Sequence, residues 1–347
     1  MYLPGHRFIK CGRHASLQVS EIQHYLILFL DSESWILYSL SMDKLVDNLK
    51  KHVNVLASDI GSRSIQEPLN LSRAQSYIHD RFTDHGQAVR VQDYEAFGNP
   101  TANLVAFHPD TDLDSPLLLL GAHYDTVMGT PGADDNASAV AVMLEVTRLL
   151  SARTGDKPYR VLFAAFSTEE PPSFNSSFMG SRVFVRSLET EKLVIQGALI
   201  LEMVGYYRDE AGTQKIPLTV KWMGFPTTAD FIAVVGNGRS RSLVKGVSEG
   251  IVDSNCGLPV EDLTIPGSGY LLPEARLSDN VSFWDARIPA VMITDTSFFR
   301  NPHYHTPRDR PETLDYEKMG QLVKGLVHFF REKGKAEGPE PVEELEK

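Results

Sequence analysis

Four apolar runs, each followed closely by polar residues, constrain the fold of this chain more than any other feature. Such runs are typical of strands buried on both faces of a sheet. Segments with the apolar spacing of a helix lie between and around them, which indicates helices packed against both faces. The sequence therefore predicts an α/β protein, a three-layer α/β/α sandwich around a mixed, mainly parallel central sheet. The predicted strands are these four runs, at 116–121, 159–166, 197–204 and 290–294, and one more at 101–107. The predicted helices are 44–60, 72–84, 135–150 and 313–333.

The polar residues at the ends of these runs are imidazoles and carboxylates. In open α/β sheets, ligands bind beyond the carboxyl ends of the strands, so we expect these side chains to converge there. Glu202 stands between apolar residues, and burying its charge without a partner is costly. A divalent cation would remove that cost, and zinc suits such ligands best. The candidates are His123, Asp125, Asp135, Glu169, Glu170, Glu202 and His305.

The supply of candidate ligands is richer than a single zinc ion needs. No H-E-x-x-H segment is present, and the two cysteines lack the spacing of a zinc cage. Two imidazoles and three carboxylates suit a pair of ions that share a carboxylate and lie about 3.5–4 Å apart. His303 is an alternative to His305, although in an extended segment the two side chains point in opposite directions.

Five sequence blocks together resemble a known family. They are AHYDT at 122–126, GADDNAS at 132–138, FSTEE at 166–170, LEMVGY at 201–206 and YHTPRD at 304–309. In order and spacing they are similar to the zinc-dependent aminopeptidases of metallopeptidase family 28, the co-catalytic dizinc exopeptidases. That family also includes glutamate carboxypeptidases and glutaminyl cyclases, and the resemblance covers residues 42–335.

The resemblance implies an exopeptidase with two Zn²⁺ ions per chain that removes the first residue of peptide substrates. Glu169 is then the general base, and it activates a water that bridges the two ions. Asp125 orients one ligand imidazole, and Tyr304 helps stabilise the reaction intermediate. The implied metal ligands are His123, Asp135, Glu170, Glu202 and His305.

Three other functions stay open on the same scaffold. A glutaminyl cyclase-like acyltransferase would hold one zinc ion, although the acidic pair Asp134 and Asp135 followed by Asn136 favours a peptidase. A carboxypeptidase would need arginines that bind the substrate carboxylate. A receptor that has lost its chemistry would lack ligands that are all present here. The chain departs from the family at Asn280, where many members have histidine, so this residue is given no role.

Composition bears on partners and location. The chain has 34 basic and 45 acidic residues, a net charge of −11, which argues against nucleic-acid binding. No apolar run is long enough to cross a membrane, and no convincing signal peptide is present, which favours the cytoplasm over secretion. We expect an N-terminal extension of doubtful order at 1–41, one catalytic domain at 42–335 and an acidic tail at 336–347. The sequence leaves the oligomeric state and the preferred first residue of the substrate open, and we expect segments 207–230 and 253–277 to form the pocket walls.

Overall fold

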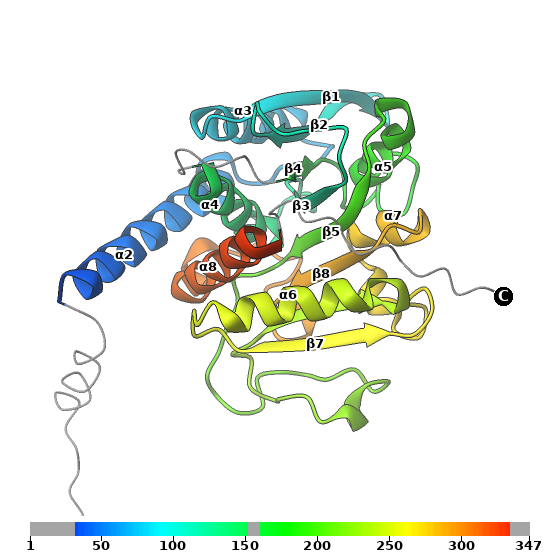
Figure 1. Ribbon diagram of the computed structural model, residues 1–347. Coiled ribbons are helices and arrows are strands. Elements are labelled where there is room, and N and C mark those ends of the chain that lie inside the picture. Colours follow the sequence, from blue (N-terminus) through cyan, green and yellow to red (C-terminus); the bar gives the residue numbers. More distant parts are fainter. Residues whose placement is uncertain (1–31, 152–159, 334–347) are drawn as a thin grey trace, which may run out of the picture. The chain divides into compact units, whose positions relative to one another are not determined.

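A mixed sheet forms the centre of the protein (Figure 1). The computed structural model describes residues 32–151 and 160–333, with side chains from residue 42 onward. Residues 1–31 of the predicted extension and the whole predicted tail at 336–347 therefore lie outside the described residues. The chain divides into two units at Lys44 and Leu45, and the sheet belongs to the second unit.

The described sheet has the strand order β1-β2-β4-β3-β5-β8-β6-β7. Its centre, from β4 through β3 and β5 to β8, is parallel, whereas the β1-β2, β2-β4 and β8-β6 pairs are antiparallel and the β6-β7 pair is parallel. The predicted fold class is confirmed. The strands are β1 (Ala88–Ala96), β2 (Asn99–Phe107), β3 (Leu117–His123), β4 (Val161–Phe166), β5 (Ile195–Glu202), β6 (Ile232–Asn237), β7 (Val260–Ile265) and β8 (Ala290–Thr294).

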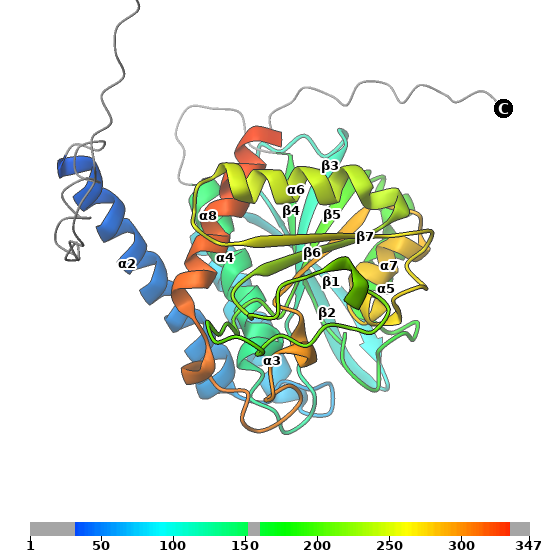
Figure 2. The same cartoon turned by 90° about the horizontal axis from the view of Figure 1, so that it is seen from below.

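Helices cover both faces of this sheet (Figure 2). Helices α4, α6 and α8 pack together on one face, with α3 next to α4, while α5 and α7 pack against each other on the opposite face. The helices are α2 (Ser32–Asn54), α3 (Pro68–Asp84), α4 (Ala139–Ser151), α5 (Gly180–Glu191), α6 (Arg241–Asp253), α7 (Asn280–Asp285) and α8 (Tyr316–Lys333). Among the described residues, no helix has the length and apolarity needed to cross a membrane.

One predicted helix boundary is wrong in a way that matters for the site. The helix expected at 135–150 begins only at Ala139, and residues 133–138 form a wide turn instead. Asp135 and Asn136 have non-helical backbone angles in this turn, and both are buried. The side chain of Asn136 binds the backbone of β5, donating to the Leu201 carbonyl and accepting from the Met203 amide. These tertiary hydrogen bonds outweigh the helix-capping tendency of the acidic pair.

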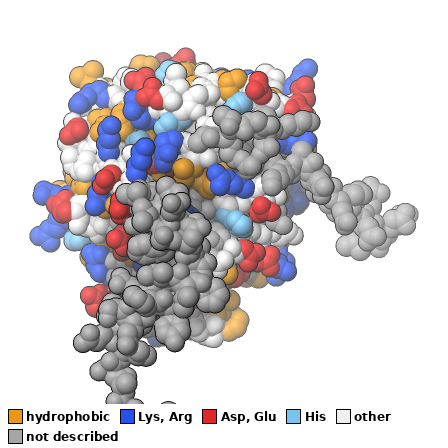
Figure 3. All heavy atoms as spheres, turned by 60° about the vertical axis from the view of Figure 1, so that its left-hand side comes forward, with side chains coloured by type: hydrophobic (Ala, Val, Ile, Leu, Met, Phe, Trp, Pro, Cys, Tyr) orange, Lys and Arg blue, Asp and Glu red, His pale blue; other side chains and the backbone are white. Residues whose placement is uncertain are grey.

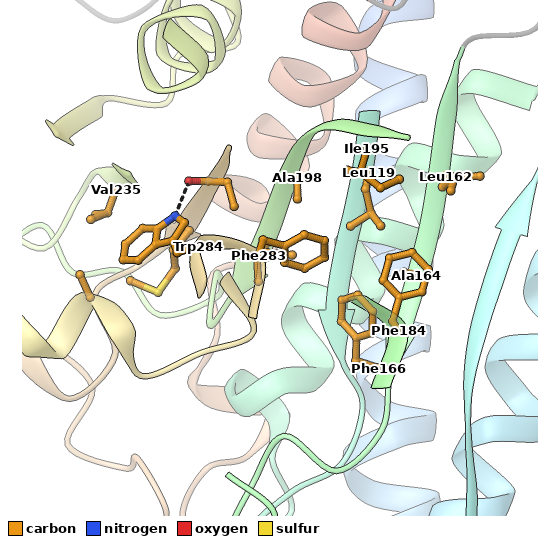
Figure 4. Packing of buried hydrophobic residues seen from close by; sticks show 14 of the residues in the cluster. Leu119, Leu162, Ala164, Phe166, Phe184, Ile195, Ala198, Val235, Phe283 and Trp284 are labelled. Carbon is orange, nitrogen blue, oxygen red and sulfur yellow. Dashed lines mark hydrogen bonds between the residues drawn. The ribbon is translucent and has the colours of Figure 1, made fainter. Parts of the chain in front are cut away.

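One large apolar core cluster lies on the face that α5 and α7 cover (Figure 4). Phe184 from α5 and Phe283 from α7 pack on Phe166 of β4, with ring centroids 5.6–6.3 Å apart. Trp284 donates from Nε1 to the Ala290 carbonyl, so its polar atom is satisfied. Each such buried side chain contributes about 1.5–3 kcal/mol relative to exposure, and together they fix the strands whose ends carry the candidate ligands.

The surface charge has no single sign on the face shown in Figure 3. Acidic and basic side chains are interspersed there with apolar and neutral ones. The acidic net charge of the chain is therefore mixed with basic groups on this face rather than separated from them.

Candidate metal centre

The candidate ligands come from four strand ends and one turn. His123 ends β3 and Glu202 ends β5, and the parallel pairing of Gly121 with Ile200 places both ligands level on the same face of the sheet. Glu170 follows β4, and His305 lies in the loop after β8. The 133–138 turn adds Asp135. Residues separated by about 180 positions in the sequence thus meet at one edge of the sheet.

These side chains form two groups with metal-ligand composition. His123, Asp135 and Glu202 make one group, in which His123 Nε2 lies 3.4 Å from Asp135 Oδ1 and 3.3 Å from Glu202 Oε2. Asp135, Glu170 and His305 make the other, in which His305 Nε2 lies 3.1 Å from Asp135 Oδ2 and 3.3 Å from Glu170 Oε1. Each carboxylate oxygen of Asp135 therefore faces a different imidazole, as a carboxylate shared between two cations would.

The interior of this cluster contains more negative charge and more unpaired polar atoms than a cation-free protein tolerates. Both ring nitrogens of His123, Asp135 Oδ1 and Glu169 Oε1 are buried without a hydrogen-bond partner among the described residues. Burial and the nearby charge of Asp135 raise the pKa of Glu170 to about 8. Divalent cations would give His123 Nε2 and Asp135 Oδ1 a partner and would neutralise the carboxylates, so the residues present fit a metal centre.

Asp125 connects three parts of this cluster. Its Oδ1 lies 3.4 Å from His123 Nδ1, on the ring edge opposite the other acids. The same carboxylate accepts hydrogen bonds from the backbone amides of Glu169 and Glu170, at 3.0 and 3.1 Å. It therefore orients the His123 ring and fixes the backbone that carries both glutamates, a common arrangement behind metal-binding imidazoles.

Asp309 holds the other side of the centre in the same way. Its two oxygens accept from the backbone amides of Asp134 and Asp135, at 2.9 and 3.0 Å. Asp134 in turn accepts from Asn301 Nδ2 and from the amide of Gly205. Asp309 belongs to the YHTPRD block, so its position beside the site was visible in the sequence, but its function as a backbone acceptor was not.

The remaining predicted residues lie around this centre. Glu169 is buried, and burial together with the charges of Glu170 and Glu202 raises the pKa of its carboxyl. The Tyr304 ring stacks on His305 with 3.7 Å between centroids. His303 belongs to neither metal-ligand group of the described residues, and its ring packs against the edge of Tyr206.

The side-chain amide of Asn280 makes a contact near its own position in the chain. Its Nδ2 donates to the Ala275 carbonyl within the turn that precedes α7. Its neighbour Ser278 does contact the centre, because its hydroxyl donates to Glu202 Oε2 at 2.6 Å. Sequence reasoning passed over Ser278, which carries no chemical signal beyond its place before an acidic residue.

A fully buried arginine next to the centre was also missed. The Arg63 guanidinium donates five hydrogen bonds to backbone carbonyls, at 2.7–3.0 Å, and makes no ion pair with any described carboxylate. Burial lowers its pKa to about 10, although Asp309, Asp125 and Asp135 oppose the shift. The carbonyls of Tyr124, Pro131 and Gly132 flank the end of β3 and the 133–138 turn. The other two belong to Leu56 and Gly61, in and after the turn that follows α2.

Arg63→Met is expected to lower the free energy of unfolding of the metal-free protein by at least about 3 kcal/mol. The substitution leaves several buried carbonyls without a donor, and each charged hydrogen bond contributes about 1.5–3 kcal/mol. Urea unfolding measures this effect, with the surface variant Arg73→Met as control, which should change stability by less than about 0.5 kcal/mol. Equal stability of the two variants would show that Arg63 does not fix these loops.

Comparison with known proteins identifies the family. Residues 103–330 match the sequence profile of Peptidase family M28. The Escherichia coli (strain K12) protein YfbL is 40% identical over 294 residues, which cover 81% of this chain and 86% of YfbL. Aminopeptidase YwaD of Bacillus subtilis (strain 168) is 28% identical over 244 residues, covering 67% of this chain and 46% of YwaD. This chain therefore spans about half the length of YwaD.

Solved structures share the fold. BSAP, a zinc aminopeptidase from Bacillus subtilis, superposes with a TM-score of 0.63 at 16% identity, covering 83% of this chain and 94% of BSAP. The glutaminyl cyclase of Porphyromonas gingivalis gives a TM-score of 0.62 at 19% identity, covering 83% of this chain and 98% of that chain. At these identities the similarity shows the architecture alone.

Proposed function

The chain belongs to peptidase family M28, and from that premise we propose that it is a zinc-dependent aminopeptidase with two metal sites. The observation that carries this proposal is the position of Asp135, whose two oxygens face His123 on one side and His305 on the other. One site would consist of His123, Asp135 and Glu202, and the other of Asp135, Glu170 and His305. A glutaminyl cyclase with a single ion would not need the second group.

Zinc, when bound, polarises a substrate carbonyl and makes water more acidic. The protein must supply the proton acceptor, and Glu169 fits that role. Its carboxylate is buried beside both groups, and its Oε1 has no partner among the described residues. The backbone bond from Glu169 to Asp125 fixes its position. Glu169 would take a proton from water and pass it to the leaving amine, as general acid–base catalysis requires.

The surrounding residues orient the reactants. Asp125 holds the ring of His123, and Asp309 holds the backbone of the Asp135 turn. Tyr304 lies on His305, and burial raises the pKa of its phenol, so the hydroxyl keeps its proton and can donate to a developing oxyanion. The several carboxylates suit a substrate with a free α-amine. We propose residues 42–335 as the catalytic domain.

The proposal is tested by assaying the purified chain before and after removal of metal. We expect cleavage of leucine-amide substrates that is lost with a chelator and restored by zinc, with no cleavage of N-acetylated versions. Cyclisation of an N-terminal glutamine without amide cleavage would favour a glutaminyl cyclase instead. Full activity in the presence of the chelator would contradict a metallopeptidase.

A further inference from the structure

An apolar pocket opens beside Glu202 on the face of the sheet that α5 and α7 cover elsewhere. The pocket lies over β8, β6 and β7, where irregular segments at 214–225 and 272–277, with only short helical turns, form its walls instead of an α-helix. Both predicted wall segments, 207–230 and 253–277, contribute residues. Its floor is mostly apolar, and the side chains that make it are Phe231, Ala233, Val235, Leu263, Leu272 and Met292.

The strand register shows that the pocket extends from the metal centre across the sheet, from β5 to the edge strand β7. Glu202 pairs with Thr294, Thr294 with Ala233, and Ala233 with Glu261. Residues directly opposite each other on neighbouring strands point to the same face. All four residues line the pocket. These four residues form a row across the sheet, from Glu202 to Glu261. The row begins at a candidate metal ligand, continues over the small side chains of Thr294 and Ala233, and ends at a second carboxylate on the edge strand β7.

Two further carboxylates that line the pocket lack a cationic partner in the part of the chain that the structure describes. Neither Glu261 nor Glu274 makes an ion pair among the described residues, and Glu274 Oε2 is buried without a hydrogen-bond partner. Burial and the charges of Asp262 and Asp230 raise the pKa of Glu261. Lys215 also borders the pocket, but its side chain is exposed and is not paired with either glutamate.

We propose that this pocket binds a substrate side chain with an aliphatic stem and a cationic end, so that the enzyme prefers N-terminal lysine or arginine. The stem would lie on the apolar floor and the charged group would reach Glu261. Long basic side chains often bury their methylene groups in this way while the charged end meets a polar partner. This inference rests on the proposed aminopeptidase function, because that function places the first residue of the substrate at Glu202.

The length of the row fits such a side chain. Three strand spacings separate Glu202 from Glu261, about 14 Å between Cα atoms. An extended lysine side chain reaches about 6 Å from Cα to Nζ, and an ion-pair contact adds about 3 Å. The remainder, about 5 Å, accommodates the α-amine and Cα of the substrate beside Glu202. A leucine side chain would fill only the first part of the pocket.

The test compares lysine with norleucine, which has the same stem without the charge. We expect the zinc-loaded enzyme to cleave the lysine amide with a kcat/KM about fivefold higher than the norleucine amide, the upper end for one ion pair at a partly exposed site. Glu261→Gln should remove this difference by lowering only the lysine value, mainly through KM. Asp253→Asn, at an exposed position on α6, serves as the matched control and should change neither value.

Binding of lysinamide and norleucinamide, measured by calorimetry, separates this inference from the proposed function. Equal kcat/KM for the two amides, or a Glu261→Gln variant that keeps the lysine preference, overturns the inference and leaves the aminopeptidase function intact. If no amide is cleaved, the proposed function fails, and tighter binding of lysinamide that depends on Glu261 would still support the pocket assignment. If neither amide is cleaved and lysinamide and norleucinamide bind equally, the pocket assignment is overturned as well. Equal unfolding temperatures of Glu261→Gln and the unaltered protein would show that this isosteric change at a half-buried position leaves the fold intact.

Discussion

Glu169→Gln is expected to reduce kcat by about 10²–10⁴-fold while the zinc content of the protein stays unchanged. Glu169 belongs to neither group of candidate ligands, so its amide analogue removes a proton acceptor without removing a metal contact. The isosteric amide also keeps the backbone bond to Asp125. The loss should appear in kcat more than in KM, because the carboxylate acts during proton transfer rather than in binding.

Steady-state kinetics and elemental analysis of the same preparation measure both parts of this expectation. Glu95→Gln, at an exposed position on β1, is the matched control and should behave as wild type. Turnover near the wild-type rate would remove Glu169 from its role as base. Loss of zinc from Glu169→Gln would instead mean that Glu169 is a ligand.

Asp135→Asn is expected to release both zinc ions together and to abolish activity. The two oxygens of Asp135 face different imidazoles, so the substitution removes one negative charge from both sites and replaces one oxygen with a nitrogen that does not coordinate zinc. Zinc per chain after dialysis should fall from about two to near zero.

Glu170→Gln is the matched comparison, because this residue belongs only to the group with His305. We expect it to lower zinc from about two ions to about one. If Asp135→Asn also loses a single ion, Asp135 does not bridge the sites. The ratio of the two losses therefore tests the shared carboxylate independently of activity.

The sequence was informative where local pattern and tertiary environment agree. β8 (Ala290–Thr294) has the bounds predicted for the last apolar run, because a strand buried on both faces must be apolar throughout. The pattern of apolar runs did not predict β7 (Val260–Ile265). It lies at the edge of the sheet, where half-buried positions admit Glu261 and Asp262, so no continuous apolar run marks it.

Helix boundaries show the limits of local pattern more clearly. The pattern predicts a helix at 44–60, whereas α2 begins at Ser32 and ends at Asn54, before a wide turn to Ile60. The acidic pair before α4 looked like a helix start, but its backbone amides bind Asp309, which lies about 175 residues further along the chain. A partner that far away cannot be read from the spacing of neighbouring residues.

The sequence alone determined the kind of chemistry this protein can perform. Imidazoles and carboxylates at strand ends, in the order of the five blocks, carry the family resemblance that the profile match confirms. Strand ends are local features, so buried apolar runs reveal them without any tertiary information.

Only the tertiary structure decided how these groups are held and what surrounds them. It brought Asp309 and Arg63 to the backbone of the ligand turn, and it aligned Glu202 with Glu261 across four strands. The physical reason is that buried carbonyls, amides and carboxylates must each find a partner, and the partner is chosen by proximity in space. Strand register and loop packing set that proximity, and neither is encoded in any short stretch of sequence.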